Sequence, residues 1–341
     1  MNNSVKVWSI AIVTIFILGT GLFFVQKDKP VETNVSIRIL DSPDTVNNWE
    51  IAKKLTGRDF LAEEGIKLEL INSVQSTGGT QSLQALLAKN IDFAGSSWTS
   101  WINVIGSGGK VKAVVGRSVR SKDDPSFTWV VLNNSNIHTA NDFVGKKLAL
   151  NVLGAEVDYV MREYLKQNGL SIDQVQLVVV PTAQQEQILR SGQVDVAAIG
   201  TPNVNMALEK GGLRVLFTVY DVRGDVLTYG EGFREDFIKE HPDTVKKFVR
   251  VYENSRRLVW EEFQKDPERV KKAVAQIYEE KGGNSKLAKY YTPTHSPEHP
   301  YPNDKDIQWW LDVWEKDGKL KPGQIKPSDV YTNEFNSYYK K

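Results

Sequence analysis

Short apolar runs of strand type alternate with amphipathic helical stretches from Val35 onward. This alternation is typical of an α/β fold. In a first set, the pattern predicts strands at Val35–Leu40, Ile66–Ile71, Ile91–Ala94 and Val111–Val115. The predicted helices of this set are Asn48–Ala62, Gly79–Lys89 and Trp98–Ile105.

A second set of the same kind follows. Its predicted strands are Thr128–Leu132, Lys147–Leu150, Val175–Val180, Val194–Ile199 and Val215–Val219. Its predicted helices are Ala155–Gln167, Ala183–Ser191 and Pro202–Lys210, each closed by glycine, which accepts the left-handed conformation at a helix end. The remainder predicts a helical tail with helices at Arg234–His241, Pro242–Lys265, Pro267–Glu280 and Lys305–Lys316. Between the last two, Ser285–Asp304 is expected to be a loop that allows one helical turn.

This order predicts two lobes. If the second set is inserted into the first, the chain crosses between lobes near Arg117–Phe127 and again near Asp221–Asp225. Lobe 1 is then expected at 35–120 plus 225–341, and lobe 2 at 121–224. The cleft between two such lobes is the expected ligand site.

The first 34 residues have a different character. Trp8–Val25 is an uncharged, mostly apolar run of 18 residues flanked by lysines. It is just long enough for a membrane-spanning helix, and longer than the usual signal-peptide core of about 7–15 residues. Residues 1–29 are therefore expected to be an anchor or a cleaved signal, and 30–34 a linker. Both alternatives place the rest of the chain outside the cytoplasm, held at the membrane or released to the periplasm or exterior.

Composition narrows the function classes. The 341 residues suit two domains, and the formal net charge of +1 removes the electrostatic case for nucleic-acid binding. The absence of cysteine excludes disulfides, thiolate catalysis, zinc–thiolate sites and an N-terminal lipid-modified cysteine.

Sequence motifs of common enzyme classes are missing: no G-x-S-x-G, H-E-x-x-H, Walker A or G-x-G-x-x-G motif is present. We therefore expect no catalytic residues, no cofactor and no metal; His295 and His299 are separated by Pro297, which argues against a shared metal on a helix.

Candidate ligand-binding residues follow the predicted strand ends, where doubly wound sheets bind ligands. Helix N-termini there offer free N–H groups that suit sulfonate or carboxylate, although Ser and Thr at such positions also cap helices. Trp98 is expected in the cleft and Trp101 in the core; packing of both against the sheet is the alternative. Arg117 suits an anionic head group, or else a structural salt bridge, and Glu156 suits a ligand amine, or else simply favours its helix N-terminus. The full set of candidates is Ser42, Asn48, Gly79, Thr80, Ser96, Ser97, Trp98, Thr99, Arg117, Asn151, Gly154, Ala155, Glu156, Thr201 and Pro202.

Six segments in order carry a family resemblance. They are FLAEEGIKLEL (Phe60–Leu70), GGTQSLQALLAKNIDFAGSS (Gly78–Ser97), the stretch Asn141–Pro181, ILRSGQVDVAAIGTP (Ile188–Pro202), EKGGLRVL (Glu209–Leu216) and the stretch Phe237–Val259. With these segments the chain resembles the substrate-binding proteins of ATP-binding-cassette importers, in the branch for aliphatic sulfonates, taurine, nitrate and thiamine-precursor pyrimidines. The resemblance spans about Val35 to Phe335.

The resemblance implies a two-lobed fold of the type II periplasmic-binding-protein kind that closes on its ligand. It implies a monomer that captures a small anionic solute, with an aliphatic sulfonate or taurine favoured, and hands it to permease and ATPase subunits. Two alternatives stay open: an enzyme on the same fold, of the pyrimidine synthase or dehydratase type, and a tethered ligand sensor. The apolar N-terminal run argues against the cytosolic enzymes.

Overall fold

A computed structural model describes residues 35–43, 45–72, 79–120, 126–224, 226–295 and 300–340, all within the unit Thr33–Lys341. The predicted signal or anchor, Trp8–Val25, and the predicted linker lie outside the described residues. Within the described ranges, no helix combines the length and the apolar character needed to cross a membrane.

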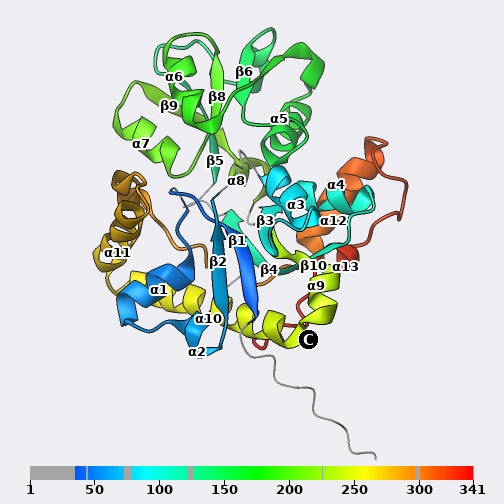
Figure 1. The fold of residues 1–341 in the computed structure, drawn as a ribbon. Helices are drawn as coiled ribbons and strands as arrows, with labels where there is room; N and C mark the ends of the chain where they lie inside the picture. The colour runs from blue at the N-terminus through cyan, green and yellow to red at the C-terminus, as the bar shows by residue number, and fades with distance from the viewer. Residues whose placement is uncertain are drawn as a thin grey trace, which may run out of the picture. The chain divides into compact units, whose positions relative to one another are not determined.

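The first sheet has five strands in the order β2-β1-β3-β10-β4 (Figure 1). β1 pairs in parallel with β2 and β3, whereas β10 runs antiparallel to both β3 and β4. The carboxyl ends of β1, β3 and β4 therefore lie at one edge, beside the start of β10. The strands are β1 (Ser36–Leu40), β2 (Lys67–Ile71), β3 (Phe93–Ser97), β4 (Val111–Arg120) and β10 (Val226–Arg234).

The second sheet also has five strands, in the order β7-β6-β8-β5-β9. β6 is parallel to β7 and β8, and β5 is antiparallel to β8 and β9. The carboxyl ends of β6 and β8 thus share an edge with the beginning of β5. The strands are β5 (Phe127–Leu132), β6 (Lys147–Leu150), β7 (Gln176–Val179), β8 (Val196–Gly200) and β9 (Leu213–Thr218).

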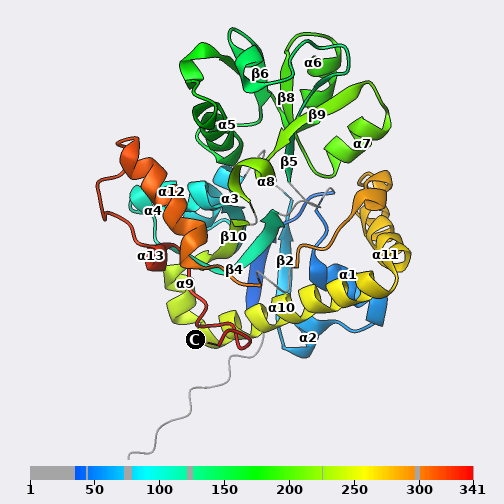
Figure 2. The same ribbon diagram turned by 180° about the vertical axis from the view of Figure 1, so that it is seen from behind.

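Helices cover both sheets, and the views from the two sides show them on opposite faces (Figure 2). The helices associated with the first sheet are α1 (Asn48–Thr56), α2 (Phe60–Glu63), α3 (Gly79–Leu87), α4 (Trp98–Gly106), α9 (Glu235–Glu240), α10 (Pro242–Lys265), α11 (Pro267–Glu280), η4 (Ser285–Tyr290), α12 (Asp304–Lys316) and α13 (Pro327–Val330). Those of the second are η1 (Ala140–Phe143), α5 (Glu156–Gln167), η2 (Ile172–Gln174), η3 (Thr182–Gln184), α6 (Gln185–Arg190), α7 (Asn203–Glu209) and α8 (Val219–Arg223). This architecture confirms the predicted two-lobed α/β fold.

One local prediction was wrong, and one strand was not predicted. The single helix predicted at Asn48–Ala62 is two helices, because Gly57 takes a left-handed φ of 73° and closes α1. Strand β10 was not predicted, because Gly230 and Gly232 interrupt its β-type pattern. Gly230 is required there: a Cβ atom at this position would lie 2.2 Å from the Trp98 ring.

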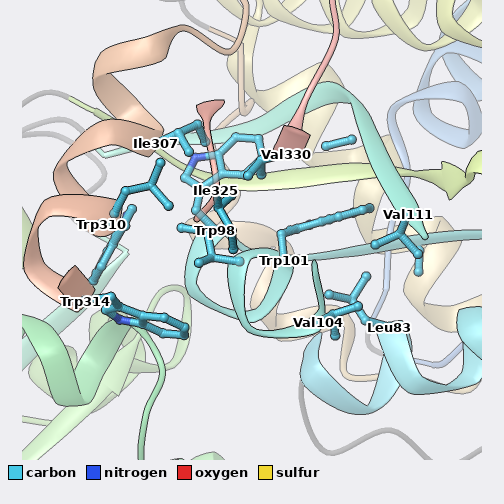
Figure 3. Close-up of a cluster of buried hydrophobic side chains, with 14 of the residues drawn as sticks. Leu83, Trp98, Trp101, Val104, Val111, Ile307, Trp310, Trp314, Ile325 and Val330 are labelled. Carbon is cyan, nitrogen blue, oxygen red and sulfur yellow. The ribbon is translucent and has the colours of Figure 1, made fainter. Parts of the chain in front are cut away.

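Trp98 and Trp101 belong to a buried apolar cluster between β10 and helices α3, α4 and α12 (Figure 3). The indole N–H of Trp98 donates to the carbonyl oxygen of Leu227 at 2.8 Å, and that of Trp101 donates to Gly230 at 3.0 Å. Both indoles are therefore hydrogen-bonded to β10. This strand, which was not predicted, thus fixes the orientation of both side chains in this part of the core.

Candidate functional site

A cavity of about 380 Å³ lies between the facing edges of the two sheets. Its walls come from both lobes. The first lobe contributes residues 45–49, Arg117 on β4 and parts of β10, α10, α11 and η4, and the second contributes Ser126, Thr201 and Pro202. A cavity of this size and position is typical of a small-molecule site.

The charged centre of this cavity is built by two neighbouring strands. Tyr229 on β10 lies directly opposite Arg117 on β4. Side chains alternate along a strand, so Glu231 shares their face of the sheet. Nη1 of Arg117 donates to Oε1 of Glu231 at 3.1 Å, and the guanidinium lies 5.9 Å from the Tyr229 ring centre.

The two partners of this ion pair differ in exposure. The Arg117 side chain is 33% exposed, whereas that of Glu231 is 8% exposed. Burial acts to lower the pKa of Arg117, but the negative charge and hydrogen bond of Glu231, together with the neighbouring Tyr252 and Tyr229, outweigh burial, and the pKa lies above its ordinary value. Arg117 therefore stays charged, and it is the more accessible member of the pair.

Tyrosine hydroxyl groups surround this pair. Burial raises the pKa of Tyr252 well above its ordinary value, and the nearby charge of Glu231 raises it further. Burial likewise raises the pKa of Tyr291, whose hydroxyl donates to the side-chain oxygen of Asn48 at 3.4 Å. Both phenols are thus neutral hydrogen-bond donors at ordinary pH.

The loop before α1 forms another wall. The Glu50 carboxylate accepts from the backbone N–H of Asn47 at 2.7 Å, which completes a capping box at the helix start. This fixes Asn47 and Asn48 where both line the cavity. Ser42 is bonded to Thr45 at 2.9 Å in the same loop, and only Thr45 of the two lines the cavity.

A contact between the lobes borders the cavity. Glu209 at the end of α7 accepts from Lys289 and from the hydroxyl of Tyr290, which are both on η4. Tyr290 itself lines the cavity. At this edge the cavity is therefore bordered by a polar contact between the two lobes.

Of the predicted ligand-binding residues, the structure brings together Asn48, Arg117, Thr201 and Pro202 around this cavity. Thr80 and Gly154 instead line a separate space of about 690 Å³ that also borders α4 and α12. In that space the Thr80 hydroxyl is hydrogen-bonded to that of Ser100 at 2.9 Å. The Ser97 hydroxyl is hydrogen-bonded to that of Thr99 at 2.8 Å and lines neither space.

The remaining candidates lie in the core or near helix starts and do not line the Arg117 cavity. Ser96 and Thr99 are fully buried, and Gly79 packs against Ser96. Asn151, Gly154 and Ala155 lead into α5, where the N–H of Gly154 donates to Asp158 at 2.8 Å. Glu156 is the first residue of α5 and is 5% exposed; its charge acts on Arg223. Glu156 is not among the residues that line the Arg117 cavity.

The expectation for Trp98 is corrected. Its side chain is 0% exposed and lies in the core beside Trp101, so it does not face the cleft. The spacing of the two tryptophans correctly placed them near each other, but Gly230 leaves room for Trp98 on the sheet face. His295 is partly buried at an edge-on contact with Trp260, and His299 lies outside the described residues.

Sequence reasoning missed the aromatic and acidic lining. The cavity residues not anticipated include Trp49, Tyr229, Glu231, Tyr252, Tyr278, Tyr290 and Tyr291. The available signal was the segment from Val226 to Arg234, in which polar and aromatic side chains alternate with glycine. Read as a strand, it would have placed Tyr229 and Glu231 on one face.

The two sheets, with a cavity between their facing edges, define the two-lobed fold of type II periplasmic binding proteins. Residues 56–269, more than half of the chain, match the family model described as NMT1/THI5 like. The chain therefore belongs to the NMT1/THI5-like family, and the resemblance predicted from the sequence is confirmed.

Individual relatives agree with this assignment. A protein of Brucella abortus (strain 2308) named as a binding protein is 26% identical over 273 residues, covering 76% of this chain and 79% of the relative. A Bacillus subtilis (strain 168) protein, whose name refers to binding aliphatic sulfonates, is 26% identical over 208 residues, covering 60% and 58% of the two chains. The alkanesulfonate-binding protein of Xanthomonas axonopodis pv. citri, solved with MOPS, superposes with a TM-score of 0.66 at 18% identity and covers 87% of this chain and 98% of that one.

Proposed function

We propose that this chain is the extracytoplasmic solute-binding component of an ATP-binding-cassette importer and captures a small organic anion of the sulfonate class. The observation that carries the proposal is Arg117, a charged guanidinium presented in a cavity whose walls come from both lobes. A ligand held there contacts both lobes, so it favours the closed arrangement over the open one. A permease with its ATPase is the partner to which the closed form delivers the solute.

Several features support binding without bond chemistry. Among the described residues that line the cavity there is no histidine and no lysine, and the chain has no cysteine. Asparagine, threonine and tyrosine side chains supply neutral hydrogen-bonding groups around the guanidinium. The names of the relatives favour sulfonates as ligands. The sequence favours an aliphatic sulfonate or taurine, so these compounds are the first to be tested.

A thermal-shift screen of the full-length chain tests this function. The panel contains alkanesulfonates, taurine, nitrate, carboxylates and pyrimidines. A ligand at 100 times its dissociation constant adds about 2.7 kcal/mol to the free energy of unfolding, which raises Tm by a few degrees. We expect sulfonates to raise Tm; a panel in which only neutral pyrimidines do so would refute the anionic class.

Replacement of Arg117 provides the matched test. Arg117→Ala removes charged hydrogen bonds to the ligand, so we expect affinity to fall about 10- to 100-fold, as measured by titration calorimetry. The surface variant Arg58→Ala, which loses an exposed pair with Glu63 and a contact with the Phe60 ring, serves as the control. Unchanged sulfonate affinity in Arg117→Ala would assign Arg117 a structural role only.

A further inference from the structure

We propose that the ligand of the Arg117 cavity carries an aromatic ring beside its single anionic group. This inference rests on the proposed function, because it narrows the class of solute that the same cavity captures. It distinguishes aromatic sulfonates from aliphatic ones and from taurine.

The composition of the walls is the first argument. Of the 18 described residues that line the cavity, six are aromatic: Trp49, Tyr229, Tyr252, Tyr278, Tyr290 and Tyr291. Aromatic residues make up only 10% of the whole chain, so the cavity is strongly enriched in them. Aliphatic side chains are few there, with Val46 and Leu287 beside Pro202. Aromatic rings gain extra attraction from other rings in offset or edge-on geometry, which an alkyl chain does not supply.

Size is the second argument. A cavity of about 150 Å³ is sufficient to bind benzene. The Arg117 cavity, at about 380 Å³, therefore accommodates one ring with its acidic group and further substituents. A two-carbon sulfonate would leave most of this space to water and most of the aromatic walls without contact.

The arrangement of charge is the third argument. Arg117 and Glu231 are the only ionised side chains among the described residues that line the cavity. Glu231 is almost fully buried and is bonded to Arg117, so the more accessible guanidinium is the group left to meet a ligand. Tyr229 lies directly opposite Arg117 across the strand pair. A ring attached directly to an acidic group bound at Arg117 therefore lies within reach of Tyr229.

Calorimetric titration of the full-length chain with three sulfonates tests this inference. Benzenesulfonate and cyclohexanesulfonate have similar size and equal charge, whereas ethanesulfonate lacks a ring. We expect benzenesulfonate to bind about 3- to 10-fold more tightly than cyclohexanesulfonate, and ethanesulfonate to bind more weakly than both. Cyclohexanesulfonate or ethanesulfonate binding as tightly as benzenesulfonate overturns the aromatic class but leaves the sulfonate function standing. Failure of all three to bind overturns both.

A variant series locates the preference. Tyr229→Leu should reduce the ratio of benzenesulfonate to cyclohexanesulfonate affinity to about one, whereas Tyr229→Phe, which keeps the ring, should retain it. Tyr339→Leu, at a 39% exposed position outside the cavity, is the matched control. If Tyr229→Leu fails to fold, Tyr290→Leu takes its place, because Tyr290 also lines the cavity. A ratio unchanged in the folded leucine variant overturns the role of these rings.

Discussion

At the scale of single residues, Trp98 shows how the same side chain can be taken for a ligand contact or for core. It is fully buried, its N–H is bonded to Leu227, and its ring lies against Gly230. Trp98→Ala should therefore lower the free energy of unfolding by about 3–5 kcal/mol, as expected for a large buried aromatic. Urea denaturation followed by circular dichroism measures this change.

The control for Trp98 is Leu70→Ala, at a 50% exposed position, where we expect a change within about 0.5 kcal/mol. A Trp98→Ala protein of normal stability that had lost ligand affinity would contradict the core assignment. It would return Trp98 to the cleft, where the sequence placed it.

His295 predicts a pH dependence of stability. Burial, with a smaller contribution from the positive charges of Arg256 and Arg257, lowers the pKa of His295 from 6.5 to about 3. As the pH falls below about 6.5, the unfolded chain takes up a proton that the folded chain does not, so the stability of the folded chain decreases until about pH 3. His295→Gln should remove part of this acid sensitivity.

Urea midpoints at pH 7 and pH 4.5 measure the effect, with the exposed His138→Gln as the matched control. If the His295→Gln variant and the parent lose equal stability between pH 7 and pH 4.5, groups other than His295 cause the acid sensitivity. A greater loss of stability in the variant at pH 4.5 would reverse the sign argued here.

At the scale of elements, α5 and α12 form a contact between the lobes. Tyr159 on α5 is 2% exposed and lies in the core cluster of the first lobe, 5.7 Å from Trp310 and 5.8 Å from Trp314 between ring centres. Lys319 donates to its hydroxyl. Arg223 on α8 lies 3.4 Å from the Trp309 ring centre, and burial lowers its pKa to about 10. The second lobe is thus attached to α12 through Tyr159 and Arg223, each of which contacts two tryptophan rings of that helix.

Tyr159→Ala should loosen this attachment. We expect a larger radius of gyration for the unliganded protein by small-angle X-ray scattering, because the lobes separate more readily. Tyr159→Phe keeps the ring contacts with Trp310 and Trp314 and loses only the bond to Lys319, so it should scatter like the parent. An unchanged radius for Tyr159→Ala would mean that the contacts of Arg223 and Glu209 suffice to hold the lobes.

The elements also show how far the sequence could predict the structure. Pro242–Lys265 and Pro267–Glu280 were predicted with the observed bounds, because proline marks each start and the apolar period is regular. β10 was not found, because its glycines serve the packing of Trp98 and not the strand pattern. Tyr252 and Tyr278 lie on these well-predicted helices, yet their place in the cavity depends on which helix face meets the first sheet. That choice arises from tertiary packing, which local periodicity does not encode.

At the scale of the whole molecule, the site depends on segments far apart in sequence. Asn48 and Thr201 line the same cavity from different lobes. Ligand binding should therefore slow amide hydrogen exchange in both places at once, at the start of α1 and at the end of β8. Mass spectrometry of peptides from the full-length chain, with and without a binding sulfonate, measures both. The turn at Gly145, which precedes β6 and lies at the end of the second sheet away from the cavity, should exchange at an unchanged rate. Protection confined to the first lobe would mean that the solute binds at Arg117 without drawing the second lobe onto it, and capture by closure would then be wrong for this protein.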